Sequence, residues 1–305
     1  MKIISVINYK GGVGKTTITA NIASELAYRG KKVLMLDMDP QASLTFSFLK
    51  PEDWEKDLSK EKTIKKWFET INESSTIALN DLIISPINVQ GKLVSNGGKL
   101  DLISSHLGLI NIDLDLATEL GGSSMNVVKK NFIKVHARLL EGINNLSSES
   151  YDIILIDCPP NFNIVTKNAI VASDFILIPA KPDYLSTLGI DYLIRNVKEL
   201  VKDYNEFSEG TNFQKIDPKI LGVIFTMIQI QSGQPVSAQR QYIQQTKRLG
   251  VTCFSSYFRN NPTIFADAPQ WGYPVVLNRY SQQTYKDIVS EIEELVREFR
   301  IKLGI

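Results

Sequence analysis

The sequence predicts an α/β fold in which a mostly parallel, twisted sheet is flanked by helices on both faces. Short apolar runs alternate with longer amphipathic stretches along the 305 residues. The apolar runs are nearly continuous, without the polar alternation of a strand that has one solvated face. Strands that are buried on both faces and separated by helices are typical of a parallel sheet.

Strands are expected at the short apolar runs, the first of which leads directly into a glycine-rich loop: Lys2–Ile7, Lys32–Leu36, Leu100–Ser104, Ile153–Ile156, Phe175–Ile178, Ile220–Thr226 and Val251–Phe254. Helical spacing predicts helices at Lys15–Arg29, Asn126–Gly142, Leu185–Tyr204, Ser237–Leu249 and Ser281–Leu303. Strands and helices therefore follow one another along most of the chain.

Residues 50–98 depart from this pattern because they are polar, mixed in charge and interrupted by Pro51 and Pro86. A helix is expected inside this stretch at Thr63–Ile71. We interpret residues 50–98 as an elaboration at the edge of the sheet, and residues 1–305 as a single domain. We also expect no N-terminal helix-turn-helix domain, because the glycine-rich loop begins already at Tyr9.

Composition excludes several classes of protein. The 34 Lys and Arg residues nearly balance the 33 Asp and Glu residues, so binding to nucleic acid would require a local basic patch. The two cysteines, Cys158 and Cys253, cannot form a disulfide framework, and this cysteine usage suits a cytoplasmic protein. No apolar run approaches the ~20 residues of a membrane-spanning helix.

The first strand is followed at once by a glycine-rich loop and a helix: Asn8-Tyr9-Lys10-Gly11-Gly12-Val13-Gly14-Lys15-Thr16-Thr17. In this context glycines allow backbone N–H groups to surround an anion, and the helix N-terminus adds partial positive charge. We expect Lys15 to reach the β- and γ-phosphates of a nucleotide and Thr16 to bind Mg²⁺. Tyr9 stands where the usual phosphate loop has its first glycine, and Lys10 is an additional lysine.

Acidic residues follow two of the expected strands. Asp37 and Asp39 come after Lys32–Leu36, and Asp157 ends the run at Ile153–Ile156. The carboxyl ends of parallel strands are where α/β sheets bind ligands. We expect Asp157 to bind Mg²⁺, usually through water. For Asp37 and Asp39 the alternative is a pair of aspartates that merely cap the loop.

The segment Lys10-Gly11-Gly12-Val13-Gly14-Lys15-Thr16 resembles the deviant Walker A motif of the ParA/MinD family of ATPases, and among these the ParA/Soj-type partition ATPases. Three further segments also resemble the family: Asp157-Cys158-Pro159-Pro160, Ser173–Tyr184 and Ala266–Val275. The resemblance covers most of the chain outside residues 50–98. It implies a P-loop NTPase fold of the deviant Walker A type, with ATP and Mg²⁺ as cofactors.

The resemblance also implies roles for individual residues. Lys10, Lys15 and Asp39 are implied as catalytic, with Asp39 positioning the attacking water and Lys10 reaching the nucleotide of a second subunit. Mg²⁺ would be bound by Thr16 and Asp157, with Asp37 supporting its shell. The expected nucleotide contacts are Lys10, Gly11, Gly12, Val13, Gly14, Lys15, Thr16 and Thr17 at the phosphates, and Phe258, Asn260 and Pro269 at the adenine.

Family resemblance further implies a weak Mg²⁺-dependent ATPase that forms a homodimer around two ATP molecules. Such a dimer binds DNA without sequence preference at the nucleoid, and a ParB-type partner stimulates hydrolysis and release, which segregates plasmid or chromosome DNA. Two alternatives stay open. The same motor could position another cargo, such as a carboxysome or a chemoreceptor cluster, or the protein could be a MinD-like membrane-associated division regulator.

The C-terminal third of the sequence bears on the choice between DNA and membrane. Between Arg240 and Lys286 there are six basic residues and one acidic residue. We take five of these basic residues as candidate DNA contacts, with a solvated helix face as the alternative: Arg240, Lys247, Arg248, Arg259 and Arg279. The last helix has an apolar stripe on one side, and its polar side carries both acidic and basic residues. A helix that lies on a membrane surface should be richly basic there, so we expect this helix to dock on the domain instead.

Overall fold

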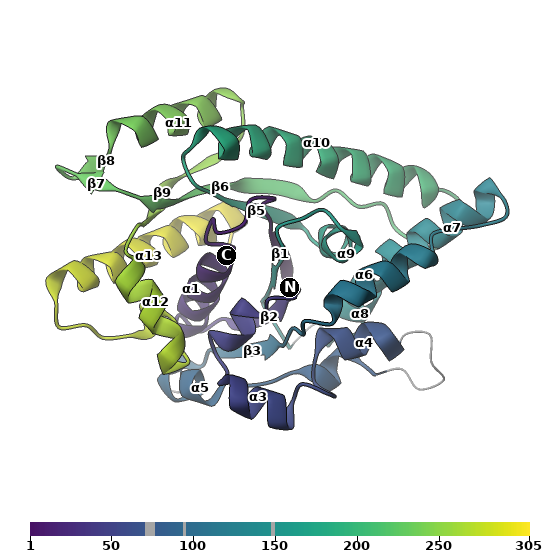
Figure 1. Cartoon of the computed structure of the whole chain (residues 1–305), viewed down its shortest axis with the longest axis horizontal. Helices are drawn as coiled ribbons and strands as arrows, with labels where there is room; N and C mark the ends of the chain where they lie inside the picture. Colours follow the sequence, from purple (N-terminus) through teal and green to yellow (C-terminus); the bar gives the residue numbers. More distant parts are fainter. Residues whose placement is uncertain (71–76, 94–95, 148–149) are drawn as a thin grey trace.

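The computed structural model describes residues 1–70, 77–93, 96–147 and 150–305. Within these residues the chain forms a parallel sheet of seven strands in the order β3-β2-β4-β1-β5-β6-β9, with helices on both faces (Figure 1). The predicted fold class is therefore confirmed. The strands are β1 (Lys2–Val6), β2 (Lys32–Asp37), β3 (Lys99–Ile103), β4 (Ile153–Asp157), β5 (Phe175–Ala180), β6 (Lys219–Ile228) and β9 (Cys253–Arg259).

The sheet separates two hydrophobic cores, and successive residues of one strand contribute to different cores. In β4, Ile154 and Ile156 belong to one core, while Ile153 and Leu155 belong to the other. This is why the central strands are apolar at every position and not at alternate positions. A small antiparallel hairpin lies outside the sheet, formed by β7 (Ile230–Gln231) and β8 (Gln234–Pro235).

Helices cover the two faces as separate groups. One face is covered by α1 (Lys15–Tyr28), α2 (Ser43–Phe46), α5 (Ile87–Leu93), α12 (Pro262–Trp271), η3 (Val275–Leu277) and α13 (Gln283–Leu303). The other face is covered by α4 (Ile64–Thr70), η1 (Leu79–Leu82), α6 (Leu109–Thr118), α7 (Met125–His136), α8 (Arg138–Asn144), α9 (Ile164–Val171) and α10 (Tyr184–Phe207). Two further helices are α3 (Pro51–Asp57) and α11 (Ser237–Arg248), of which α11 packs beside α10.

The prediction of one helix at Asn126–Gly142 is wrong, because the chain forms two helices with a break at Ala137. The side chain of Asn168, on α9, enters the backbone at this point. Its Nδ2 donates to the carbonyl of Val135 at 3.0 Å, and its Oδ1 accepts from the N–H of Leu139 at 3.2 Å. A side chain that replaces the bonds of the helical ladder bends or divides a helix.

Among the described residues outside 50–98, four α-helices were not predicted: α2, α6, α9 and α12. The sequence does contain a signal for α12, because Asn261 precedes Pro262. The side chain of Asn261 caps the helix by accepting from the N–H of Ile264 at 3.2 Å, and proline suits the first helical position.

In its described residues, the stretch 50–98 contains the short helices α3, α4, η1 and α5. The predicted helix at Thr63–Ile71 corresponds to α4, although Ile71 lies outside the described residues. Trp67 and Phe68 pack into one core of the sheet, whereas Val89 and Leu93 pack into the other. This stretch thus lies against the β3 edge of the sheet and covers both of its faces there.

The last helix, α13, docks on the domain as expected. It packs against β9 and α1, and its apolar stripe is buried: Ile288, Ile292, Leu295, Val296, Phe299 and Leu303. In the part of the chain that the structure describes, none of the helices combines the length and the hydropathy that a membrane span requires.

Truncating this stripe should therefore destabilise the fold. Phe299 is fully buried, so we expect Phe299→Ala to lower the free energy of unfolding by about 3–5 kcal/mol. Ile301 is 73% exposed on the same helix, and Ile301→Ala should change the free energy of unfolding by less than about 0.5 kcal/mol. Urea unfolding of both variants measures the difference. Equal stability of the two variants would contradict the docking of α13.

Candidate nucleotide-binding site

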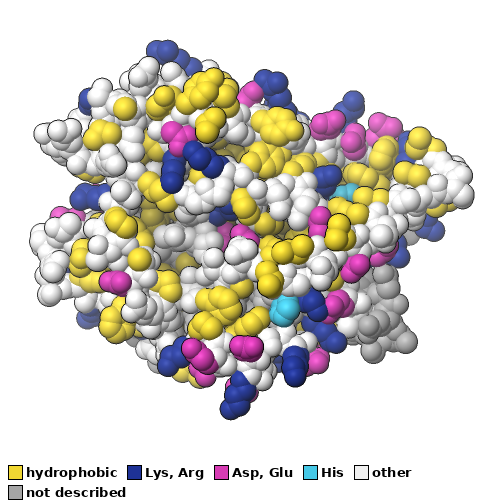
Figure 2. Space-filling view, viewed as in Figure 1, with side chains coloured by type: hydrophobic (Ala, Val, Ile, Leu, Met, Phe, Trp, Pro, Cys, Tyr) yellow, Lys and Arg dark blue, Asp and Glu magenta, His cyan; other side chains and the backbone are white. Residues whose placement is uncertain are grey.

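The loops that follow β1, β2 and β4 meet at the carboxyl edge of the sheet, because these three strands are neighbours. Asp157, at the end of β4, lies in register with Val6 on one side and with Asp37 on the other. The glycine-rich loop, Asp37 and Asp157 therefore come together in the middle of this edge, where the sequence predicted a ligand site. The surface of the molecule in Figure 2 is hollowed between the part that carries α11 and the part that carries α12.

The glycine-rich loop, residues 8–14, contains two residues in the left-handed region, Gly12 with φ 67° and Gly14 with φ 81°. Side chains rarely adopt this backbone conformation. A β-carbon added at Gly11 or Gly12 would have no neighbouring atom within 4 Å, so this part of the loop faces open space. The loop is bound to the sheet at both ends, since Asn8 Nδ2 donates to the Pro179 carbonyl at 2.6 Å and Thr226 Oγ1 donates to the Val13 carbonyl at 2.8 Å.

Lys15 lies inside this loop, and its side chain is buried. Its Nζ donates to the carbonyl of Asn8 at 3.2 Å. Burial lowers the pKa of Lys15, and the carboxylates of Asp157 and Asp39 oppose that effect. Gly14 caps α1 without a side chain, so the N–H groups of the first helical turn have no side-chain acceptor from the cap. These groups and the ammonium group fit the phosphates of a nucleotide.

Two buried carboxylates, Asp157 and Asp37, end neighbouring strands, and Asp157 acts on the charge of Lys15. Asp157 accepts from Thr16 Oγ1 at 2.7 Å and from Thr19 Oγ1 at 3.3 Å. Burial raises the pKa of Asp157 to about 7. Burial, together with the charge of Asp157, raises the pKa of Asp37 to about 8. A divalent cation next to these groups would favour their charged forms, so the donors fit Mg²⁺.

The geometry distinguishes between the expected metal ligands. Thr16 and Asp157 contact each other directly, so both could face one Mg²⁺ ion. Asp37 instead accepts three bonds from its own loop, from the N–H and Oγ1 of Thr45 and from the N–H of Asp39. Among the described residues no group of three or more His, Cys, Asp or Glu side chains could hold a metal by itself. The cation would therefore need oxygens of the nucleotide and of water.

Asp39 follows β2 in the loop that ends at α2. Its Oδ1 accepts from the N–H of Gln41 at 3.0 Å, so the loop-capping interpretation describes one of its contacts. Its side chain is half-buried and contributes to the electrostatic field at Lys15 and Asp157. Asp39 is therefore within electrostatic reach of Lys15 and Asp157.

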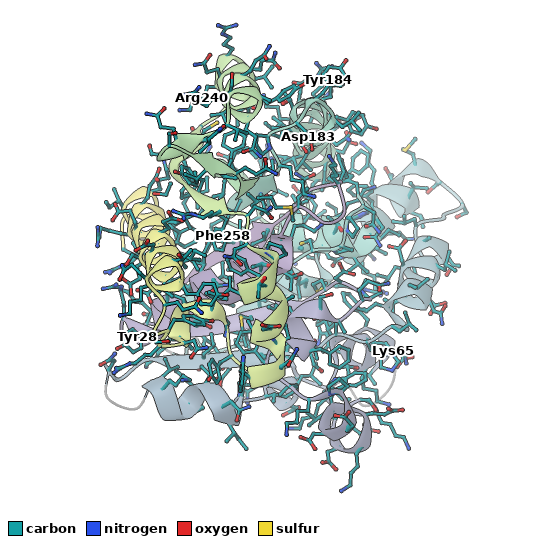
Figure 3. The ribbon with its side chains drawn as sticks, turned by 60° about the vertical axis from the view of Figure 1, so that its left-hand side comes forward. Tyr28, Lys65, Asp183, Tyr184, Arg240 and Phe258 are labelled. Atoms are coloured by element: carbon teal, nitrogen blue, oxygen red, sulfur yellow. The ribbon has the colours of Figure 1, made fainter. Side chains whose placement is uncertain are left out.

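A cavity of about 160 Å³ adjoins the start of α1 and fits the base of a nucleotide. Its lining includes Gly14 and Thr17 together with two of the residues that the sequence predicted, Phe258 and Asn260. Phe258 lies beside α12 (Figure 3), and its ring centroid is 5.8 Å from that of Phe265. The structure places Pro269 in a neighbouring hollow of about 60 Å³, next to Tyr273.

Sequence reasoning missed further residues that line this cavity, among them Thr226, Met227 and Phe265. Met227 has φ 53°, which is uncommon for a residue other than glycine. Its carbonyl accepts from Gln239 Nε2 of α11 at 3.1 Å. No local motif marks these residues, because they reach the cavity only through the pairing of β6 with β9 and the packing of α12.

Lys10 does not point into the cradle that surrounds Lys15. Its Nζ lies 2.6 Å from Asp183 Oδ2 and 3.5 Å from Ser186 Oγ. Asp183 is also the N-cap of α10, because its Oδ1 accepts from the N–H of Ser186 at 2.8 Å. About one third of the Lys10 side chain remains exposed. The two lysines of the loop therefore have different surroundings, one buried and one at the surface.

The structure separates the five basic residues that the sequence grouped together. Arg240, Lys247 and Arg248 are exposed on α11, and Figure 3 shows Arg240 pointing away from the body of the domain. Arg259 instead forms an ion pair with Glu291 of α13. Arg279 is exposed in a hollow lined by Glu25 and Glu293, at the opposite end of α1 from the phosphate loop. Only the three residues on α11 form one patch.

The chain has relatives among known families and proteins. A family model described as an AAA domain matches residues 1–209. An uncharacterised protein of Methanocaldococcus jannaschii is 31% identical over 82% of this chain and 80% of its own length. The sporulation initiation inhibitor protein Soj of Bacillus subtilis is 28% identical over 95% of this chain and 98% of its own length.

Solved structures share the fold over nearly the whole chain. Apo McdA of Cyanothece has a TM-score of 0.70 and 23% identity, covering 98% of both chains. A plasmid partition protein of Borrelia burgdorferi bound to AMPPNP has a TM-score of 0.67 and 21% identity, covering 99% of both chains. A cobyrinic acid a,c-diamide synthase of Mycobacterium smegmatis reaches the same TM-score of 0.67 at 19% identity, covering 98% of this chain and 94% of its own. At these identities the likeness concerns the fold, which hosts more than one activity.

The buried position of Lys15 makes a direct prediction about nucleotide binding. Lys15→Ala removes the ammonium group that would contact the β- and γ-phosphates, so we expect the affinity for ATP to fall at least about 100-fold, on the order of 3 kcal/mol. Isothermal titration calorimetry measures it. Lys31→Ala, beyond the far end of α1, is the control and should bind ATP as the parent does. Unchanged affinity of Lys15→Ala would contradict the site.

Proposed function

The chain belongs to the ParA/MinD type of P-loop ATPase, within the AAA-domain family whose model matches residues 1–209, and from this we propose that it is an ATP-dependent partition ATPase. It binds Mg-ATP at the glycine-rich loop, with the base in the cavity beside Phe258. It hydrolyses ATP weakly by itself. The ATP-bound form is a homodimer that binds DNA non-specifically at the nucleoid, and a ParB-type partner stimulates hydrolysis and release.

One observation carries this proposal: the ammonium group of Lys10 lies outside the cradle formed by its own loop. Lys15 already supplies the local charge, and Lys10 is held 2.6 Å from Asp183 at the surface. A lysine at this place can reach the phosphates of a second subunit that approaches the same face. Two facing ATP molecules would bring several negative charges together, and a lysine from each subunit would offset their repulsion.

When bound, ATP would supply the phosphoryl group that is transferred to water, and Mg²⁺ would supply positive charge beside the phosphates. The residues of this chain then have separate tasks. Lys15 and the N–H groups of the loop hold the phosphates, and Thr16 and Asp157 hold the metal. Asp39 orients a water molecule for attack on the γ-phosphate, and Lys10 stabilises charge across the dimer.

The exposure of the basic residues on α11 and the position of this helix beside α10 support the binding of the dimer to DNA. The three basic residues of α11 are exposed and lie on a helix that packs beside α10, whose first residues contact Lys10. Contacts of this kind bind phosphates without reading the base sequence. The membrane alternative has less support, since the apolar stripe of α13 is buried in the domain. The cargo could be plasmid or chromosome DNA, or a protein assembly such as a carboxysome.

The role of Lys10 can be tested through dimerisation. Lys10→Ala should bind ATP within about threefold of the parent, because Lys15 remains in place, yet it should stay monomeric. Light scattering with a non-hydrolysable ATP analogue measures the mass. Lys181→Ala is a control that removes a nearby lysine and should dimerise normally. A Lys10→Ala dimer as stable as that of the parent would contradict the proposal.

The role of α11 can be tested through the salt dependence of DNA binding. Each phosphate contact contributes about −0.9 to the slope of log K against log salt, so replacing Arg240, Lys247 and Arg248 with alanine should flatten the slope by up to about 2.7. ATP affinity should not change. Arg279→Ala is the matched control, since Arg279 is exposed far from α11 beside Glu25 and Glu293. A slope that responds to Arg279 instead would move the DNA surface there.

A further inference from the structure

Ser105, two residues beyond the end of β3, contacts the loop that carries Asp39. Its Oγ donates to the carbonyl of Asp39 at 2.6 Å, and its N–H donates to Thr45 Oγ1 at 2.9 Å. Ser105 and Thr45 are both fully buried. We infer that Ser105 is a positioning residue that fixes Asp39 for its action on the attacking water, an inference that rests on the proposed ATPase function.

The contacts of Ser105 belong to a closed network of hydrogen bonds. Thr45 accepts from Ser105 and donates through its own Oγ1 to Asp37 Oδ2 at 2.7 Å. Asp37 Oδ1 accepts from the N–H of Asp39 at 3.2 Å. The peptide groups on both sides of Asp39 are therefore held, its N–H by Asp37 and its carbonyl by Ser105. Ser105 reaches both branches of this network from the loop that follows a different strand, β3.

We expect these hydrogen bonds to matter more for the position of the Asp39 side chain than for the stability of the fold. Ala42, three residues after Asp39, has φ 53°, so the loop adopts a conformation that a short peptide would not keep without outside contacts. The direction of the Asp39 side chain depends on the peptide groups that Ser105 and Asp37 hold. Misplacing a catalytic group by about 1 Å can cost on the order of 100-fold in rate. Nucleotide affinity, which depends on the separate loop at residues 8–15, should be little affected.

Ser104 provides a matched control, because it is a neighbouring and equally buried serine whose contacts lie elsewhere. Its Oγ donates to the carbonyl of Lys62 at 2.7 Å and accepts from Trp54 Nε1 at 3.2 Å. Both of these partners belong to residues 50–98. The two serines thus have the same chemistry and burial but hold different loops.

The experiment compares the parent with Ser105→Ala, Ser105→Thr and Ser104→Ala. For Ser105→Ala we expect kcat to fall about 10- to 100-fold, with ATP affinity and ATP-dependent dimerisation within about threefold of the parent. In the nucleotide-free protein, amide hydrogen exchange of residues 38–44 should become at least about fivefold faster. Ser105→Thr, which keeps the hydroxyl, should recover most of kcat, and Ser104→Ala should keep the parental kcat and exchange.

The outcomes separate this inference from the proposed function. A parent that does not hydrolyse ATP at all contradicts the proposed ATPase, whatever the variants do. If the parent is active, three results each overturn the role of Ser105: a parental kcat in Ser105→Ala, unchanged hydrogen exchange at residues 38–44, or an equal loss in Ser104→Ala. If Ser105→Ala does not fold, Ser105→Cys takes its place with the same expectations, because a thiol is a weak donor of similar size.

Discussion

The site depends on placing charged groups inside the carboxyl edge of a parallel sheet. Asp157 ends the central strand β4 and is fully buried beside Lys15. An isolated buried charge is costly, so each such group must be paired or hydrogen-bonded. Thr16 and Thr19 satisfy Asp157, and the carbonyl of Asn8 satisfies Lys15. The backbone of the phosphate loop, the first turn of α1 and the end of β4 are thereby fixed relative to one another.

From this centre the structure extends in two directions. On one side, Asp37 in β2 connects to Thr45, Asp39 and, through Thr45, to Ser105 beyond β3. On the other side, Val13 in the phosphate loop accepts from Thr226 in β6. Next to Thr226, the Met227 carbonyl accepts from Gln239 of α11. The helix that would bind DNA is therefore connected to the phosphate loop indirectly, through Met227 and Thr226 of β6.

Lys10 differs from these groups because both it and its ion-pair partner, Asp183, are partly exposed. Its ion pair with Asp183 has both side chains about one third exposed, and such a pair contributes little to stability. Releasing Lys10 from Asp183 would therefore cost little, as the role proposed for Lys10 at a second subunit requires. A buried lysine such as Lys15 could not serve this purpose, since its surroundings already require its charge.

The sequence by itself determined the fold class, the phosphate loop and the carboxylates at the strand ends, because apolar runs, glycines and strand-terminal aspartates are local signals. Phe258 and Asn260 followed from a resemblance, and the structure places both in the lining of the cavity beside α1. Only the tertiary structure decided that Arg259 pairs with Glu291, that Arg279 lies apart from α11, and that Asn168 divides α7 from α8. Ser105 likewise gains its contact with Asp39 only because β3 pairs with β2. These partners are far apart in sequence, so no local pattern of residues can encode them.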